Sequence, residues 1–139
     1  MIKACIFDLG GTIIDRYSLT PLLAFRKAFK KYAIDLSPSL IRKDMGLNKM
    51  DHINKIFENT DIQKQWLGLN LEIADNRVRK DIFKGFSKIQ AKETIERMKI
   101  IPETIGCMRY LQDNNILTGV TTGFDYEQTM RVKSLLETY

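Results

Sequence analysis

A short apolar segment near the start of the chain, Ala4 to Phe7, runs directly into an acidic residue and then a pair of glycines. This pattern predicts a short buried strand that ends at Asp8, because Gly10 and Gly11 break it. The Asp8 carboxylate would then lie at the carboxyl end of a strand, where open α/β sheets bind their ligands. The sequence also allows a plainer interpretation, in which an ordinary turn follows and Asp8 is a solvated cap.

The glycines after Asp8 suit a binding site for an anion. Because glycine has no Cβ, Gly10 and Gly11 allow backbone N–H groups to approach a phosphate closely. A carboxylate beside such a turn can attack phosphorus, provided that a divalent cation offsets the repulsion between the negative charges. Asp8 is therefore a candidate nucleophile.

A second apolar segment, Ile116 to Val120, predicts another strand, which closes on Thr121, Thr122 and Gly123. The two strand ends would meet at one edge of a sheet and face the same anion. Hydroxyl and backbone N–H groups at the second strand end would hold phosphoryl oxygens.

The sequence between the strands has a helical pattern, with apolar residues recurring every three or four positions. Thr20 and Ser37, each followed by proline, are typical helix caps. A helix resumes at Asn48 after a break at Gly46, and another carries Leu69 and Ile73 on its apolar side. Beyond the second strand, a final helix runs from about Asp125. The predicted fold is α/β, with a partial Rossmann-like core at 1–16 and 100–139 and an inserted helical domain at 17–99. Two strands cannot make a sheet covered on both faces, so the core looks incomplete.

Composition and charge limit the function further. A hydrophobic content of 44% and a charged content of 28% are typical of a soluble globular protein. No apolar run is long enough to cross a membrane and no signal peptide is visible, so we expect a cytoplasmic protein without a membrane partner. We expect Cys5 and Cys107 to be buried thiols rather than a disulfide framework.

Residues 17–99 hold 17 lysines and arginines against 10 aspartates and glutamates, within a chain of net charge +5. This surplus suits an anionic substrate, or nucleic acid. For the cluster of four cations we favour an ordinary solvated helix face, and we expect no nucleic-acid partner; the four are Arg26, Lys27, Lys30 and Lys31.

The sequence FDLGGT at residues 7–12 resembles the first motif of the haloacid dehalogenase-like superfamily, and TTG at residues 121–123 resembles its second. The helical insertion resembles that superfamily's cap domain. Superfamily phosphatases carry a second aspartate two residues after the nucleophile, which protonates the leaving oxygen. Here Gly10 occupies that position, so that general acid is absent.

The sequence MGLNKMDHI at residues 45–53 closely resembles the cap signature of the phosphonoacetaldehyde hydrolase (phosphonatase) family. The spacing from Asp8 to Lys49 is also similar to that family's, and the resemblance covers essentially the whole chain. It implies that Lys49 forms a Schiff base with the substrate aldehyde, while Asp8 attacks phosphorus to give an aspartyl phosphate. A carbon–phosphorus bond has no leaving oxygen to protonate, and an iminium accepts the electrons of the departing carbon instead.

The same resemblance implies that Met45 and His52, which share the helix face of Lys49 or the adjoining turn, handle protons around the amine. Lys49 must then act as a free amine, which burial or nearby cations would favour. Taken singly, these residues have ordinary interpretations as a solvated lysine, a structural histidine and a packed methionine.

The resemblance further implies a small-molecule phosphonate substrate, a homodimer through the cap, and Mg²⁺ held by Asp8 and the Gly10 backbone. It assigns substrate and phosphate binding to Gly10, Gly11, Thr12, Thr121, Thr122 and Gly123. Family members extend further, with a third motif that binds phosphate and a fourth that supplies acidic magnesium ligands. The chain therefore resembles the N-terminal half only, and Asp8 with one carbonyl gives too few ligands to hold Mg²⁺ firmly.

Two positions depart from the family. Phe124 replaces an aromatic that bears a hydroxyl, and Leu9 replaces a bulkier aromatic. Three functions remain open: a phosphonoacetaldehyde hydrolase completed by a partner fragment or a longer product, a phosphatase or mutase-like hydrolase, and an inactive truncated product or interaction module with exposed apolar surface. We adopt the first as our prediction, and expect weak or no turnover by this chain alone.

Overall fold

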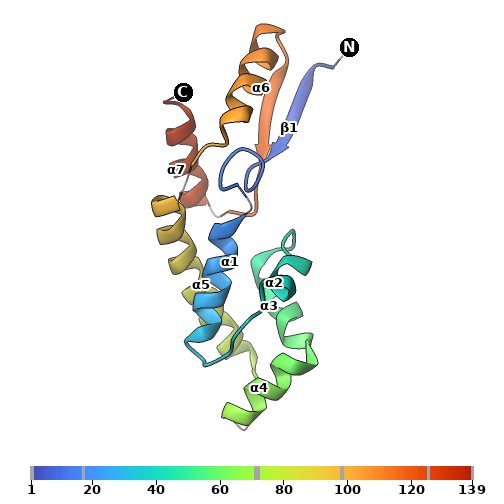
Figure 1. Cartoon of the computed structure of the whole chain (residues 1–139), viewed down its shortest axis with the longest axis vertical. Helices are drawn as coiled ribbons and strands as arrows, with labels where there is room; N and C mark the ends of the chain where they lie inside the picture. The colour runs from blue at the N-terminus through green and yellow to red at the C-terminus, as the bar shows by residue number, and fades with distance from the viewer. Residues whose placement is uncertain (1, 17, 71–72, 98, 125, 139) are drawn as a thin grey trace. The chain divides into compact units, whose positions relative to one another are not determined.

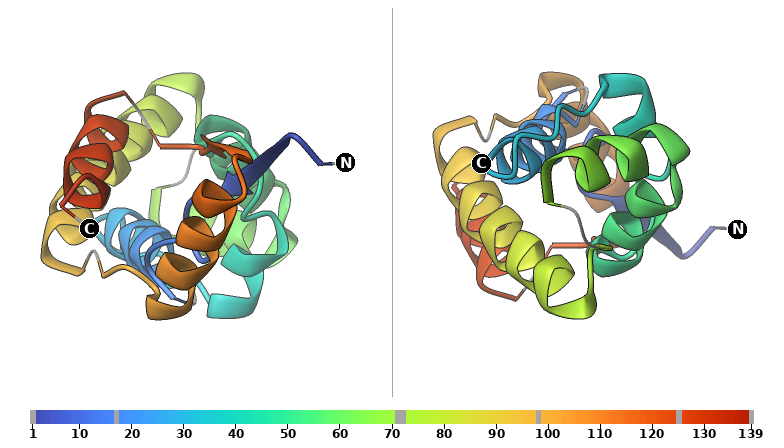
Figure 2. Two further views of the ribbon diagram at one scale, coloured as in Figure 1. Left: turned by 90° about the horizontal axis from the view of Figure 1, so that it is seen from above. Right: turned by 90° about the horizontal axis from the view of Figure 1, so that it is seen from below.

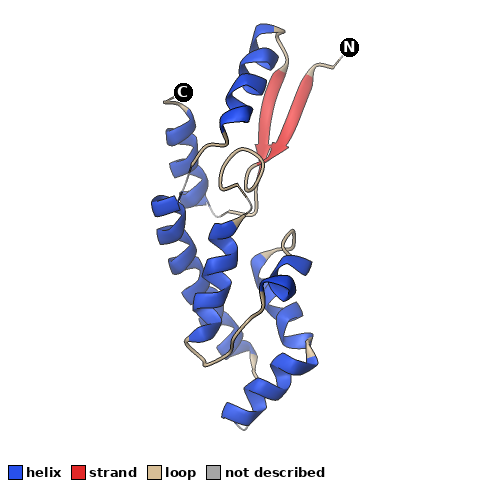
Figure 3. Ribbon diagram, in the orientation of Figure 1, coloured by secondary structure: helices blue, strands red, loops and turns tan. Residues whose placement is uncertain are grey.

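The computed structural model describes every residue except 1, 17, 71–72, 98, 125 and 139. Within that part of the chain the elements are β1 (Ala4–Asp8), α1 (Leu19–Lys30), α2 (Pro38–Lys43), α3 (Lys49–Glu58), α4 (Thr60–Asn70), α5 (Asn76–Arg97), α6 (Pro102–Asp113), β2 (Leu117–Thr121) and α7 (Tyr126–Leu136). Figures 1 and 3 show this mixture of helices with a small sheet, which confirms the predicted α/β class. Asp125, the predicted start of the last helix, lies outside the described residues.

The chain divides into two compact units. Unit 1 comprises Met1–Leu19 with Thr94–Tyr139, and unit 2 comprises Thr20–Glu93. The boundaries between the units therefore fall within α1 and α5. Each unit has a hydrophobic cluster of its own.

Unit 1 contains the sheet. β1 and β2 pair in parallel, with Ala4 opposite Leu117 and Asp8 opposite Thr121. Since both strands run in the same direction, their carboxyl ends meet at one edge, as predicted. β2 begins and ends one residue later than the sequence pattern indicated.

The core of unit 1 lies on one face of this strand pair. Its buried residues are Leu9, Ile13, Ile14 and Val132, and Phe7, Met108, Phe124 and Leu136 pack against them among others. α6 lies alongside β2, as Figure 1 shows, and Figure 2 shows the same helix in the view from above. Pro102 begins α6, where its missing N–H costs no hydrogen bond.

The prediction that β1 is a buried strand is wrong for the face of the sheet that points away from this core. Ile6 is 76% exposed and Leu117 is 74% exposed, whereas Cys5 and Phe7 on the core face are half-buried. The reason is that the described residues cover one face of this two-stranded sheet. The prediction of two buried thiols is also wrong, because Cys107 is exposed on α6.

Unit 2 is helical and packs around aromatic side chains. The rings of Phe25 on α1 and Phe86 on α5 have centroids 4.3 Å apart, and Phe57 meets the edge of Trp66 at 5.5 Å. The predicted apolar face of α4 is only partly right, because α4 ends at Asn70 and both Leu69 and Ile73 are exposed. No helix in the described part of the chain is long and apolar enough to span a membrane.

Of the two helix caps that the sequence predicts, the cap at Ser37 is confirmed, and the predicted resumption of a helix at Asn48 is confirmed as well. The Ser37 hydroxyl accepts from the Leu40 N–H at 3.2 Å, and the Asn48 side chain accepts from the Met50 N–H at 2.8 Å. α1 differs, because the Asp15 carboxylate accepts from the N–H of Leu19 at 3.1 Å. Asp15 therefore replaces Thr20 as the capping residue, and α1 begins at Leu19 rather than after Thr20.

The predicted solvated cations on α1 include one structural contact. Lys27 pairs with Glu93, whose side chain is 4% exposed in α5, while Arg26 lies 3.7 Å from Asp35 at the surface. A buried carboxylate needs a partner for its charge. The interpretation as a purely solvated face is therefore wrong for Lys27.

Candidate functional site

Asp8 is the exposed last residue of β1 and lies opposite Thr121 in the ladder. Paired positions share a face of the sheet, so their side chains emerge on the same side. The backbone continues this pairing, because the Leu9 N–H donates to the Thr121 carbonyl at 3.1 Å. The two strand ends therefore lie side by side within unit 1, as predicted.

The turn after Asp8 closes tightly on itself. The Gly11 N–H donates to the Ile14 carbonyl at 2.7 Å, and the Leu9 carbonyl accepts from the Ile14 N–H at 3.1 Å. Gly11 has φ = +86°, a conformation that glycine adopts without strain. Because its N–H is used inside the turn, Gly11 does not offer that group to an anion as we predicted. Thr12 follows as an exposed residue of the same turn.

Ser18 holds this turn from the start of α1, and the sequence analysis missed it. Its hydroxyl donates to the Gly10 carbonyl at 3.3 Å. Its backbone has φ = +50°, which is uncommon outside glycine, and its N–H donates to the Asp15 carbonyl at 2.8 Å. The spacing of apolar residues does not depend on whether a serine has a positive φ. No sequence pattern therefore predicted this role of Ser18.

The segment after β2 packs against the nucleophile turn. The Thr122 hydroxyl accepts from the Phe124 N–H at 3.1 Å, which holds the turn around the exposed Gly123. The Phe124 ring is half-buried, and a Cβ placed on Gly10 would lie 4.0 Å from it. A side chain at Gly10 would therefore extend into contact with this ring.

Two oxygen donors in this region suit Mg²⁺, namely the Asp8 carboxylate and the Gly10 carbonyl. Magnesium prefers octahedral oxygen coordination, and these two groups supply hard ligands of the right kind. The described residues contain no cluster of three or more histidines, cysteines, aspartates or glutamates that could hold a metal. These two oxygens can therefore fill part of the coordination shell of Mg²⁺, and other oxygens must fill its remaining positions.

Lys49 is the first residue of α3, directly after the Asn48 cap. Its side chain is half-buried, and its Nζ donates to the backbone carbonyl of Met45 at 3.2 Å. Met45 lies in the preceding turn and packs against the core of unit 2. The structure therefore brings Lys49 and Met45 together, with Met45 on the adjoining turn rather than on the helix face.

His52 is fully buried one helical turn after Lys49. Burial and the positive charge of Lys49 lower the pKa of His52 to about 4, against the opposing influence of the Asp44 carboxylate and the Ile41 backbone. Its ring lies against Phe25, with centroids 4.3 Å apart. Neither ring nitrogen makes a hydrogen bond within the described residues. The lowered pKa leaves the imidazole neutral at pH 7.

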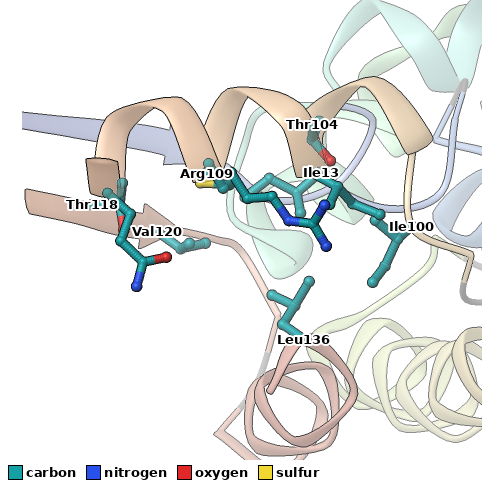
Figure 4. Close-up of a pocket in the computed structure, with 10 residues that line it drawn as sticks. Ile13, Ile100, Thr104, Arg109, Thr118, Val120 and Leu136 are labelled. Carbon is teal, nitrogen blue, oxygen red and sulfur yellow. The ribbon is translucent and has the colours of Figure 1, made fainter. Parts of the chain in front are cut away.

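A cavity of about 300 Å³ in unit 1, drawn in Figure 4, does not include Asp8 among the residues that line it. It is lined mainly by apolar side chains, with Arg109 of α6 reaching across it. Thr118 and Val120 also line it, and these positions alternate with Thr121 along β2. The cavity therefore lies on the opposite face of β2 from the Thr121 side chain.

Comparison with known families gives one match that covers almost the whole chain. The family described as "Haloacid dehalogenase-like hydrolase" matches residues 5–138. The turn at residues 9–11 and both strand ends lie within that range.

Curated relatives and solved structures give a consistent picture. The phosphonoacetaldehyde hydrolase of Lactiplantibacillus plantarum is 39% identical over 91% of this chain and 48% of its own length. That of Latilactobacillus sakei is 31% identical over 88% of this chain and 46% of its own length. A phosphonoacetaldehyde hydrolase-like protein from Oleispira antarctica has a similar fold, with a TM-score of 0.91, 27% identity, and coverage of 99% of this chain and 51% of that one. The chain thus spans about half the length of the curated relatives it matches.

Proposed function

Because the chain belongs to the haloacid dehalogenase-like hydrolase family, we propose that it supplies the nucleophile and the amine of a phosphonoacetaldehyde hydrolase. The reaction converts phosphonoacetaldehyde and water to acetaldehyde and phosphate. Similarity to two curated enzymes of that name supports the substrate. The observation that carries the proposal is the half-buried Lys49 amine, one helical turn from a buried and neutral His52.

In this proposal, Lys49 activates the substrate carbon. Its amine condenses with the aldehyde, water leaves, and a protonated C=N bond forms on Nζ. The Met45 carbonyl holds Nζ through its hydrogen bond. His52 is neutral at pH 7, so it adds no second positive charge beside the amine. The proton-handling role that the resemblance implies for His52 stays a prediction, because a pKa of about 4 makes the imidazole a weak base.

Asp8 acts on phosphorus. Its carboxylate oxygen forms a bond to phosphorus while the carbon–phosphorus bond breaks, and the released electron pair moves into the iminium to give an enamine on Lys49. Water then hydrolyses the aspartyl phosphate to free phosphate. The enamine carbon takes up a proton, and a second water releases acetaldehyde and restores the Lys49 amine.

The glycine at position 10 agrees with this chemistry. A phosphate ester needs an acid to protonate its leaving oxygen, whereas here the leaving atom is a carbon whose electrons enter the iminium. Mg²⁺, when bound, would offset the negative charge between carboxylate and phosphonate. Asp8 and the Gly10 carbonyl would hold it, and Thr12, Thr121, Thr122 and Gly123 would surround the phosphoryl oxygens.

Several further properties belong to the same proposal. Residues 17–99 would serve as the cap domain, and two copies of the protein would associate through it. The substrate would be a small phosphonate in the cytoplasm, with no nucleic acid involved.

The Schiff base can be tested on this chain directly. Incubation with phosphonoacetaldehyde and borohydride would reduce the C=N bond, and peptide mass spectrometry would locate the modified lysine. We expect preferential labelling of Lys49, its loss in Lys49→Arg, and no effect of Lys55→Arg. Lys55 is a suitable control because it is exposed on the same helix and pairs with Glu58 at 2.8 Å. Equal labelling of Lys49 and Lys55 would count against the proposal.

A further inference from the structure

Asp44 is an acidic residue at a position where a helix disfavours one. It is the C-cap of α2 and directly follows Lys43. The C-terminus of a helix carries a partial negative charge, so a carboxylate there costs stability, whereas a cation would add to it. Asp44 is half-buried and forms no ion pair within the described residues. A residue that breaks a local rule of stability in this way is a candidate for a functional role.

The turn that begins at Asp44 also holds the amine of Lys49. The Asp44 carbonyl accepts from the Leu47 N–H at 3.1 Å, which closes the turn. Within this turn, the Met45 carbonyl accepts from the Lys49 Nζ at 3.2 Å. The residue next to Asp44 therefore fixes the amine, and the carboxylate and the amine belong to one short segment of unit 2, residues 44–49.

The carboxylate of Asp44 acts electrostatically on the interior beside this segment. The charges that influence the buried His52 ring are those of Lys49, which lowers its pKa, and Asp44, which opposes that shift. From α1, the side chain that lies against the ring is the uncharged Phe25, and Phe86 of α5 packs on Phe25 in turn. Asp44 is thus the acidic group that reaches the start of α3 from a neighbouring element.

Other charged groups near α3 are directed to solvent or bound elsewhere. Arg79 of α5 donates to the Asn54 side chain at 3.0 Å, further along α3. The remaining ionisable side chains of α2, α3 and α4 are exposed, namely Arg42, Lys43, Asp51, Lys55, Glu58, Asp61 and Lys64. Water screens exposed charges strongly, so the half-buried Asp44 is the carboxylate best placed to act on the Lys49 nitrogen.

We propose that Asp44 is the counter-ion of the Lys49 nitrogen, both as the ammonium of the resting chain and as the protonated C=N bond of the reaction. The second part rests on the proposed function. A nearby carboxylate favours the charged form of a partly buried cation, so Asp44 keeps the proton on the C=N nitrogen. A protonated C=N bond accepts the electrons of the carbon–phosphorus bond more readily than a neutral one. Asp44 acts through Lys49 and is therefore a positioning residue.

The counter-ion has opposite effects on two steps. It slows condensation at neutral pH, because attack on the aldehyde needs the neutral amine and Asp44 favours the ammonium. It assists the later step, which needs the protonated C=N bond. Asp44→Asn should therefore speed condensation at pH 7 and weaken protonation of the product, a combination that a purely structural role would not produce.

The first measurement needs no substrate. Reductive methylation with isotope-labelled formaldehyde marks the lysine amines, and the NMR signal of each moves as the amine titrates. We expect the pH midpoint of the Lys49 signal, assigned by its loss in Lys49→Arg, to fall by about half a pH unit or more in Asp44→Asn. Asp44→Glu should keep the midpoint near that of the unchanged chain.

Asp51→Asn is the matched control, because Asp51 is exposed in the first turn of α3, and it should leave the Lys49 midpoint nearly unchanged. Asparagine is accepted at the end of a helix, so Asp44→Asn should unfold at the same or a higher urea concentration than the unchanged chain. A Lys49 midpoint that Asp44→Asn does not move, in a variant that folds, would overturn the inference.

The second measurement follows the C=N bond. Cyanoborohydride reduces a protonated C=N bond in preference to an aldehyde, so the pH profile of labelling by phosphonoacetaldehyde reports the proton on nitrogen. Labelling of Lys49, relative to the exposed Lys64 of α4, should decline at a pH lower by about half a unit in Asp44→Asn, and Asp44→Glu should restore it.

The two measurements separate this inference from the proposed function. Labelling at Lys49 with a pH profile that Asp44→Asn leaves unmoved would overturn the inference and leave the proposed function standing. No labelling at Lys49 in any variant would contradict the proposed function, and with it the role of Asp44 in the reaction.

Discussion

The positive charge of Lys49 helps to lower the pKa of His52, which is buried one helical turn further along α3. This pairing puts a lysine and a neutral imidazole side by side at the start of a helix. Asn48 caps that helix, so the positions of both residues follow from where α3 begins. The proposed chemistry of unit 2 depends on this relationship.

His52 is the only histidine in the sequence, so its titration can be followed without ambiguity. We expect its NMR signals to titrate with a midpoint near pH 4 in the folded chain, well below the usual 6.5. Lys49→Met should raise that midpoint, because it removes a nearby positive charge, whereas Lys55→Met should not. A midpoint near 6.5 in the folded chain would contradict the burial that the structure shows.

The same shift predicts how stability varies with pH. Between pH 4 and 6.5 the unfolded chain binds a proton at His52 that the folded chain does not, so the free energy of unfolding should rise with pH across this window. The stability that depends on a neutral His52 is fully present above about pH 6.5 and is lost as the pH falls toward 4. Its size is at most about 3 kcal/mol. Urea unfolding at several pH values measures it, and His52→Leu should flatten that part of the profile.

Gly11→Ala should destabilise unit 1 by about 1–3 kcal/mol, because its φ is positive and a Cβ would lie 2.5 Å from the Ser18 hydroxyl oxygen. Adding Ser18→Gly should recover part of the loss, since it removes the clash. Gly85→Ala is the matched control, because Gly85 lies in α5 with open space around it. That change should be neutral or stabilising by up to about 1 kcal/mol. Equal effects at Gly11 and Gly85 in denaturant unfolding would be incompatible with the turn described.

Lys27→Met should destabilise unit 2, because it removes a charged partner from the buried carboxylate of Glu93. The expected loss is about 1–3 kcal/mol. Lys30→Met, on the same helix but at an exposed position, should change the free energy of unfolding by less than about 0.5 kcal/mol. Thermal unfolding of the two variants side by side makes the comparison, and similar losses in both would show that the ion pair contributes nothing.

Local sequence signals predicted much of this fold. The apolar run into Asp8 located β1, the Ser-Pro pair at Ser37 located the start of α2, and the resumption of the helical pattern at Asn48 located the start of α3. These signals act within a few residues, so they do not depend on the rest of the chain. Resemblance then selected Lys49 and His52 from among many ordinary residues of those types.

The features that the sequence did not predict arise from contacts between distant residues. An apolar run indicates a strand but not which of its faces is covered, so the exposure of Ile6 was missed. The hydroxyl of Ser18 and the N–H of Gly11 could equally have bound an anion, and their use inside the turn follows from backbone conformations that no periodicity reports. The burial of His52 depends on Phe25 in a separate helix.

Release of acetaldehyde from phosphonoacetaldehyde, with Mg²⁺ present, is the most direct test of the central claim. It is best measured on the complex of this chain with the part of the Lactiplantibacillus plantarum phosphonoacetaldehyde hydrolase that the match leaves over, beside Lys49→Arg and Asp8→Asn variants of the chain. We expect release by the complex, loss of release in both variants, and little or no release by the chain alone. A complex that forms but releases no acetaldehyde, or one whose activity survives Lys49→Arg, would contradict the account.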